Sequence, residues 1–341
     1  MTIFAKLPLT NQQLFTKLIA RQLVVPDEDK STVYDALVKL GYYRFTGFCL
    51  PFIQLNAKNS KIFQANTTIH KILALYRFDT ALRSLANHAL EKIEIALASS
   101  ICNALCLNDS SLWYANPVIF TDPATHAEIL QTALKHMKFD QLNNHGVPYN
   151  PNEYLRHYYK TYDNPRLPPA WMLRECASFG FWSYAYSGLK QPQKVLIADA
   201  WKYPNKKLIE PTVFESWLHT VSVFRNRCAH HRRITHTTLP YNPKTPGNMP
   251  TAARFPKPDA NGNPNTNDLR TFFLVIEILL RNAAPNYDWK KDVRDQFEKS
   301  EAAGVAVAHA TGFQFAWRDD VFWSDWTPPP KLIRGNAAVR N

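Results

Sequence analysis

Nine consecutive residues near the middle of the chain, 225–233, concentrate side chains that bind phosphate and transfer protons. They read Arg-Asn-Arg-Cys-Ala-His-His-Arg-Arg, with four guanidinium groups, two imidazoles and one carboxamide. Arginine stays charged and its planar fork matches phosphate oxygens, while histidine titrates near neutral pH and suits proton transfer. Such a set is sufficient, without a metal, for attack of a ribose 2′-hydroxyl on the neighbouring phosphodiester. The alternative is a solvated basic helix end whose cations complement the helix dipole.

The spacing between Arg225 and His230 is a weak signal by itself. Roughly 0.6 pairs with this spacing are expected by chance in a chain of this composition, and Arg83 with His88 forms a second one. On a helix, Asn226 and His230 share a face at i and i+4, whereas Arg225 lies at its margin. Arg225 reaches a ligand beside His230 only if the helix unwinds near Cys228 or if a second subunit completes the site.

The charge of the chain favours an anionic partner. The net charge is +12, and residues 151–240 hold 13 Lys and Arg against 6 Asp and Glu. The basic excess therefore lies in the same part of the chain as the Arg/His cluster, as expected for binding RNA. A basic soluble protein without a special partner remains the alternative.

Cysteine usage and the apolar runs indicate a soluble protein of a reducing compartment. The five cysteines form no C-x-x-C pair, which argues against a zinc ribbon or a disulfide framework. No secretory segment opens the chain, and the longest apolar run, 272–280, contains Glu277 and is too short to span a bilayer. We therefore expect a cytoplasmic protein with no membrane contact, no metal and no cofactor.

Apolar spacing predicts an all-α protein. The predicted helices cover residues 9–24, 27–40, 67–101, 124–137, 171–189, 213–230, 267–283 and 287–300. The stretch 67–101 is predicted as one long helix or as two helices joined in line. The segment 41–48 is predicted as a packed aromatic connector, 108–123 as a loop, 140–168 as polar and proline-bearing, 237–265 as irregular, and the tail from Trp317 as frayed. Helices of this number and spacing predict a helical bundle.

Several separated segments resemble the Abi-like (AbiD/AbiF, Abi_2) abortive-infection proteins, a branch of the HEPN superfamily. The similar segments are Phe-Ala-Lys-Leu-Pro at 4–8, Leu-Gly-Tyr-Tyr-Arg-Phe-Thr-Gly at 40–47, the blocks 75–79, 82–83 and 91–94 of the long helix, Ser-Phe-Gly at 178–180 with Trp171 and Glu175, and Arg-Asn-x-Cys-Ala-His-His-x-Arg at 225–233. Together they span about residues 1–236 in the order of the family. The Arg-Asn-x-x-x-His motif of that superfamily falls on Arg225 and His230, and not on Arg83 and His88.

The resemblance implies a fold and an activity. We expect an N-terminal helical segment (1–62), a HEPN-like bundle (63–236), a Pro/Asn-rich connector (237–266) and a C-terminal helical extension with a tail (267–341). The implied activity is a phage-defence toxin, a metal-independent endoribonuclease acting as a homodimer, with Arg225 and His230 catalytic. An antitoxin or regulatory RNA is a possible further partner. The alternatives are a non-catalytic RNA-binding or scaffolding protein of a defence or toxin–antitoxin system, and an unrelated helical protein.

Other polar residues are expected to support the site or to bind RNA: Asn226, Arg227, His231, Arg233, Glu175, Arg83 and Asp79. Arg83 is predicted to pair with Asp79 at i−4 or to reach toward Glu175. Glu175, expected in the middle of a helix, is also a candidate for orienting Arg225, since a buried acid needs a cationic partner. The aromatic residues Tyr42, Tyr43, Trp171 and Trp217 are expected to pack in the core and not to stack on bases.

Overall fold

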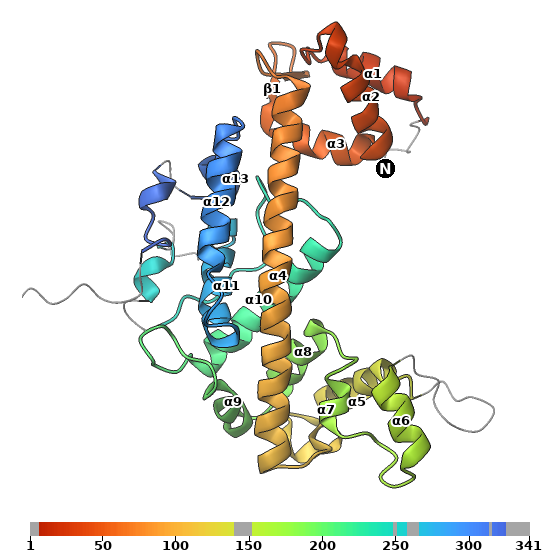
Figure 1. The fold of residues 1–341 in the computed structure, drawn as a ribbon, viewed down its shortest axis with the longest axis vertical. Helices are drawn as coiled ribbons and strands as arrows, with labels where there is room; N and C mark the ends of the chain where they lie inside the picture. Colours follow the sequence, from red (N-terminus) through yellow and green to blue (C-terminus); the bar gives the residue numbers. More distant parts are fainter. Residues whose placement is uncertain (1–6, 140–151, 248–250, 258–265, 314–315, 325–341) are drawn as a thin grey trace, which may run out of the picture. The chain divides into compact units, whose positions relative to one another are not determined.

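The computed structural model describes residues 7–139, 152–247, 251–257, 266–313 and 316–324. α-Helices dominate these ranges, and the sheet found in them has two strands, which confirms the all-α prediction (Figure 1). Residues 4–6 of the family-like start, residues 140–151 of the polar segment and the tail from 325 lie outside the described residues. None of the helices in the described ranges combines the length and the apolar composition needed to cross a membrane.

The chain divides into two compact units, each assembled from three stretches of sequence. Unit 1 comprises Met1–Asn87, Arg227–Thr238 and Trp289–Phe315, and unit 2 comprises His88–Asn226, Leu239–Asp288 and Ala316–Asn341. The helices α4 (Ile69–Asn108) and α10 (Pro211–Ala229) each contain a unit boundary, so the two units are described separately. The four linear domains expected from the sequence remain a prediction.

Three short helices, α1 (Asn11–Ala20), α2 (Lys30–Lys39) and α3 (Tyr42–Cys49), pack together at the start of unit 1 (Figure 1). Thr10 and Gln13 form a reciprocal capping box that begins α1. The prediction of a connector at 41–48 is wrong. Gly41 adopts φ 76° and its carbonyl accepts from Phe45 N–H at 3.0 Å, which starts α3 immediately after α2.

Short elements complete this part of the chain and connect the later helices. A hairpin, β1 (Ile53–Leu55) and β2 (Lys61–Phe63), pairs antiparallel with Gln54 opposite Ile62. Single turns of 3₁₀-helix are found at Asp27–Asp29, Leu50–Phe52, Trp113–Ala115, Pro117–Ile119, Ala252–Arg254 and Trp317–Asp319.

The first turns of α4 form the centre of unit 1. Its apolar stripe is buried there, with Ile69, Ile72 and Leu82 fully inaccessible to solvent. The helices α12 (Trp289–Ala302) and α13 (Val307–Thr311) belong to the same unit. Phe78 packs edge to face on Phe297 at 5.7 Å, and Trp289 Nε1 donates to Leu85 O at 3.0 Å. The long helix that the sequence predicted is thereby confirmed.

Unit 2 contains the remaining helices around the later turns of α4. They are α5 (Pro123–His136), α6 (Glu153–Thr161), α7 (Ala170–Leu173), α8 (Phe179–Gly188), α9 (Gln191–Ala198) and α11 (Leu269–Ala283), together with most of α10. The continuous helix predicted over 171–189 is wrong. The chain leaves the helix after Leu173 and begins α8 at Ser178, whose hydroxyl accepts from Phe181 N–H at 3.3 Å. The helices α6 and α9 were not predicted.

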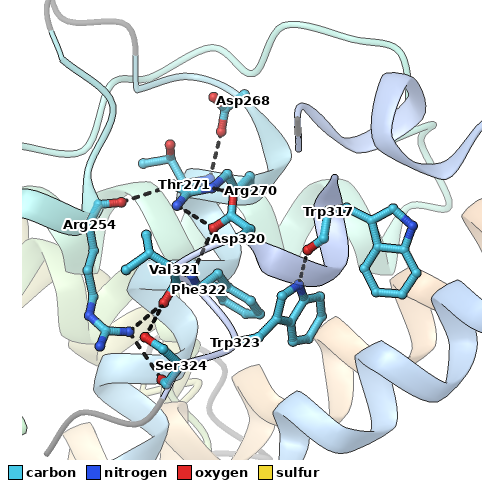
Figure 2. Close-up of polar contacts among 10 residues, drawn as sticks. All are labelled: Arg254, Asp268, Arg270, Thr271, Trp317, Asp320, Val321, Phe322, Trp323 and Ser324. Atoms are coloured by element: carbon cyan, nitrogen blue, oxygen red, sulfur yellow. Dashed lines mark hydrogen bonds and ion pairs between the residues drawn. The ribbon is translucent and has the colours of Figure 1, made fainter. Parts of the chain in front are cut away.

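A network of two arginines connects separate segments in the C-terminal part of unit 2. Arg270 forms a two-pronged ion pair with Asp320, at 2.8 and 2.6 Å, and donates to Arg254 O at 3.0 Å (Figure 2). Arg254 in turn donates to Val321 O at 2.7 Å, and Asp268 caps α11. Both arginine side chains lie in a nearly buried environment, so their donors are used to hold the chain and not to bind a ligand.

Candidate functional site

The Arg/His cluster lies where α10 ends. The apolar face of α10 is buried at Phe214, Trp217, Val221, Phe224 and Cys228, as the spacing predicted. Burial also raises the pKa of the Cys228 thiol to about 12, which excludes a thiolate nucleophile near neutral pH.

The helix stops in a turn that presents His230. The backbone N–H of His231 donates to Cys228 O at 3.0 Å, and that of Arg232 donates to Arg227 O at 3.0 Å. His231 itself adopts φ 56°. These two bonds and the left-handed residue define a Schellman motif in which His231 occupies the position that glycine usually takes. His230 is therefore the C-cap residue, and its side chain is exposed.

Arg225 is oriented by an acid from α4. Its Nη2 lies 3.4 Å from Glu94 Oε2, with the Arg225 side chain 38% exposed and that of Glu94 19% exposed. Burial raises the pKa of Glu94, and the guanidinium of Arg225 and the backbone N–H of Phe179, at the start of α8, offset only part of this effect. One edge of Arg225 is thus fixed while part of its fork remains open to solvent.

This arrangement corrects the expectation for Glu175. Glu175 lies in the break between α7 and α8 and pairs with the adjacent Arg174 at 3.0 Å, with its side chain 37% exposed. It is neither in a helix nor desolvated, so it has no need of a second arginine. The acid that holds Arg225 is Glu94, which sequence reasoning did not single out as a partner. No sequence spacing connects two residues that lie this far apart in the chain.

The pairing predicted between Asp79 and Arg83 is confirmed, and it is buried. Their side chains are 0% and 5% exposed, and Arg83 also donates to Thr80 Oγ1 at 2.9 Å. Asp79 Oδ1 accepts from Ile234 N, Thr235 N and Thr235 Oγ1 at 2.8, 2.9 and 2.9 Å. Within unit 1, this one carboxylate therefore anchors the segment that follows His230.

Two further arginines of the cluster are used by the protein itself. Arg227 Nε donates to Arg233 O at 2.8 Å, while Arg233 donates to Gly47 O and, at 3.3 Å, to His236 O. Burial lowers the pKa of both guanidinium groups. From α3, Arg44 donates to His231 O. These contacts fix the backbone around His230, which is a supporting role.

The cluster is divided between the two units. Asn226 and His231 are exposed, and Asn226 lies on the border of a groove in unit 2. The unit boundary falls between Asn226 and Arg227, so Arg225 and Asn226 belong to unit 2 and His230 to unit 1. The two residues predicted to be catalytic therefore come from different units, and their joint action on one phosphate remains a prediction.

The expectation that four aromatic residues pack holds for part of the set. Trp217 is fully buried and Tyr42 is half-buried. Tyr43 is 84% exposed and Trp171 is 49% exposed, so for these two the prediction of core packing is wrong. Tyr43 points away from the core because its helix neighbours Phe45 and Phe48 occupy the buried face.

Comparison with known proteins assigns the chain to a family. A family model described as Abi-like protein matches residues 35–236, more than half of the chain. No curated protein matches the chain, and no solved structure does. The matched range begins in α2 and ends just after the Schellman turn, so it includes Asp79, Arg83, Glu94, Arg225 and His230. The chain belongs to the Abi-like protein family.

Proposed function

We propose that the chain is an RNA-cleaving effector of abortive infection, an endoribonuclease that needs no metal ion. Family membership links the chain to phage defence. The observation that carries the proposal is the exposure of His230 at the end of α10, where its imidazole makes no hydrogen bond or ion pair to the described residues. The backbone around it is held by a buried contact from Asp79 and by an exposed hydrogen bond from Arg44. An accessible imidazole on a rigid support is what general acid–base catalysis requires.

In the proposed reaction His230 removes the proton of a ribose 2′-hydroxyl. The 2′-oxygen then attacks the adjacent phosphorus, and the bond from phosphorus to the 5′-oxygen of the next nucleotide breaks. The products are a 2′,3′-cyclic phosphate and a 5′-hydroxyl, which takes up a proton from an acid. Arg225 stabilises the negative charge on the phosphate oxygens. A homodimer supplies a second His230 as that acid, and the resemblance to the HEPN superfamily is the reason to propose one.

Cleavage of total cellular RNA in the presence of EDTA tests the proposal. Wild type is expected to cut the RNA, while Arg225→Ala and His230→Ala each lose about 10²–10³-fold in rate. Arg156→Ala and His157→Ala are matched controls, because both residues are exposed on α6 and should leave the rate unchanged. Equal rates for all five proteins would refute the assignment. RNA binding without cleavage by any of them would favour the scaffolding alternative.

A further inference from the structure

Two helices of unit 2 present polar faces to a groove of about 590 Å³. The helix α8 contributes Gly180, Ser183, Tyr184 and Ser187, at the i, i+3, i+4 and i+7 positions of one face. The helix α10 contributes a stripe with the same periodicity that includes Glu215, Ser216, His219, Ser222 and Asn226. The volume is in the range of small-molecule sites.

The groove adjoins the candidate site. Its lining includes Asn226, the residue after Arg225. The N-terminal end of α8 lies near the acid that pairs with Arg225, because the backbone N–H of Phe179 is close enough to Glu94 to lower its pKa against the effect of burial. Gly180, the next residue of α8, lines the groove. An RNA strand whose phosphate binds to Arg225 therefore has an adjoining groove in the same unit.

The groove exposes more apolar than polar surface, and so matches a ligand with a flat apolar face and uncharged polar groups at its edge. The hydroxyl groups of Ser187, Ser222 and Tyr184 already donate to acceptors of the protein, so toward a ligand they accept hydrogen bonds. The charge of Glu215 is compensated by Lys194 at 2.6 Å, and Lys244 is the cation among the lining residues. His219 contacts the ring of Tyr241 edge to face at 4.5 Å, and Tyr241 is 43% exposed. A nucleoside, with a base that can stack on a ring and with ribose hydroxyls, has this combination of properties.

We propose that this groove binds one nucleoside of the RNA, next to the phosphate that Arg225 holds. The inference rests on the proposed function, since it names a subsite of the same substrate. In this proposal, the groove-lining faces of α8 and α10 select which nucleotide lies beside the cleaved bond. The cluster at 225–233 supplies charge, whereas the groove supplies hydrogen bonds and a ring surface.

Gly180 offers a clean way to fill the groove. A Cβ at this position meets only Ser178 Oγ, at 3.8 Å, so Gly180→Ala should fold normally and leave the groove open. Gly180→Leu projects a larger side chain into it from the same backbone. His219→Ala, at an exposed position, removes the ring and provides an independent second variant.

The test measures binding of a fluorescein-labelled RNA decamer of mixed sequence to full-length protein carrying His230→Ala, which separates binding from cleavage. In this background Gly180→Leu and His219→Ala should each weaken binding about tenfold, by loss of stacking and of space, while Gly180→Ala stays within about twofold. Equal affinity of Gly180→Leu and Gly180→Ala would overturn the proposal. A second result would also overturn the proposal: Gly180→Leu weakens binding of free nucleoside monophosphates, which shows that they bind in the groove, but leaves the affinity for RNA unchanged.

Cleavage by otherwise wild-type protein distinguishes the two proposals. If Gly180→Leu raises KM and leaves kcat near the wild-type value, both stand. If the variants bind as expected but wild type cuts no RNA, the nuclease fails and the subsite stands. If wild type cuts RNA and Gly180→Leu cuts it with the same KM, the subsite fails and the nuclease stands.

Discussion

Replacing Asp79 by alanine should release the segment that carries His230. The change leaves the Arg83 guanidinium unpaired in a site where its side chain is 5% exposed, and breaking such a buried pair costs about 3–5 kcal/mol. It also deprives Ile234 N, Thr235 N and Thr235 Oγ1 of their acceptor, at about 1 kcal/mol each. Even the lower limit for breaking the ion pair, about 3 kcal/mol, is a large part of a typical folding free energy of about 5–15 kcal/mol.

Hydrogen exchange and urea unfolding measure the two consequences separately. Peptides that contain Ile234 and Thr235 should exchange much faster in Asp79→Ala, and the free energy of unfolding should fall by about 6–8 kcal/mol. Combining Asp79→Leu with Arg83→Met removes both charges, so it should restore part of the stability but not the protection of those two amides.

The matched control is Asp35→Ala in the same unit. Asp35 pairs with Lys39 at the same i,i+4 spacing, but their side chains are 65% and 70% exposed, so the cost should stay below about 0.5 kcal/mol. The reasoning would be refuted if Asp79→Ala left the two amides protected and lowered stability no more than Asp35→Ala does.

Three other substitutions or conditions should have measurable effects. Glu94→Gln should lower the rate of RNA cleavage about tenfold, because it removes the charge that orients Arg225, with KM for RNA as the second measurement. Gly188→Ala should reduce the stability by about 2 kcal/mol and so lower the thermal midpoint, because a Cβ there would lie 2.7 Å from two side chains of α5. Gly180→Ala should leave the thermal midpoint unchanged. His236, whose pKa burial lowers to about 4, should make stability fall by about 1–2 kcal/mol as pH decreases from 6.5 to 4.

The sign of the last effect is set by proton binding. Between pH 4 and 6.5 the unfolded chain binds a proton at His236 that the folded chain does not, so stability is complete above the upper limit and is lost toward the lower one. His236→Asn, which tolerates the local φ of 46°, should flatten this part of the pH profile. A profile unchanged by that substitution would contradict the assignment. Full activity of Glu94→Gln would show that Arg225 needs no partner.

Sequence reasoning succeeded where the determinants are local. The stripes of α4 and α10 extend over many turns, and Asp79 lies one turn before Arg83, so periodicity alone located both. It failed at 41–48, where aromatic residues dominate, and at 174–178, because a single glycine or serine decides where the next helix begins.

The long-range contacts of the site could not be predicted from the sequence. Arg225 meets Glu94, and Ile234 meets Asp79 across 155 residues, and neither pairing has a spacing rule. The groove was missed for a related reason: the faces of α8 and α10 are individually ordinary polar faces and become a site only when they oppose each other.

The composition of unit 1 has a consequence for the order of synthesis. The stretch with His230 is completed by residues that precede it and follow it in the chain: Asp79 accepts from Thr235 N, and Ala310 O accepts from His236 N at 2.9 Å. Phe297, which packs on Phe78, also contacts Phe313. A nascent chain therefore exposes the Arg/His segment well before the ribosome has made the residues that complete its core. The finished unit can exist only after translation has passed Phe313.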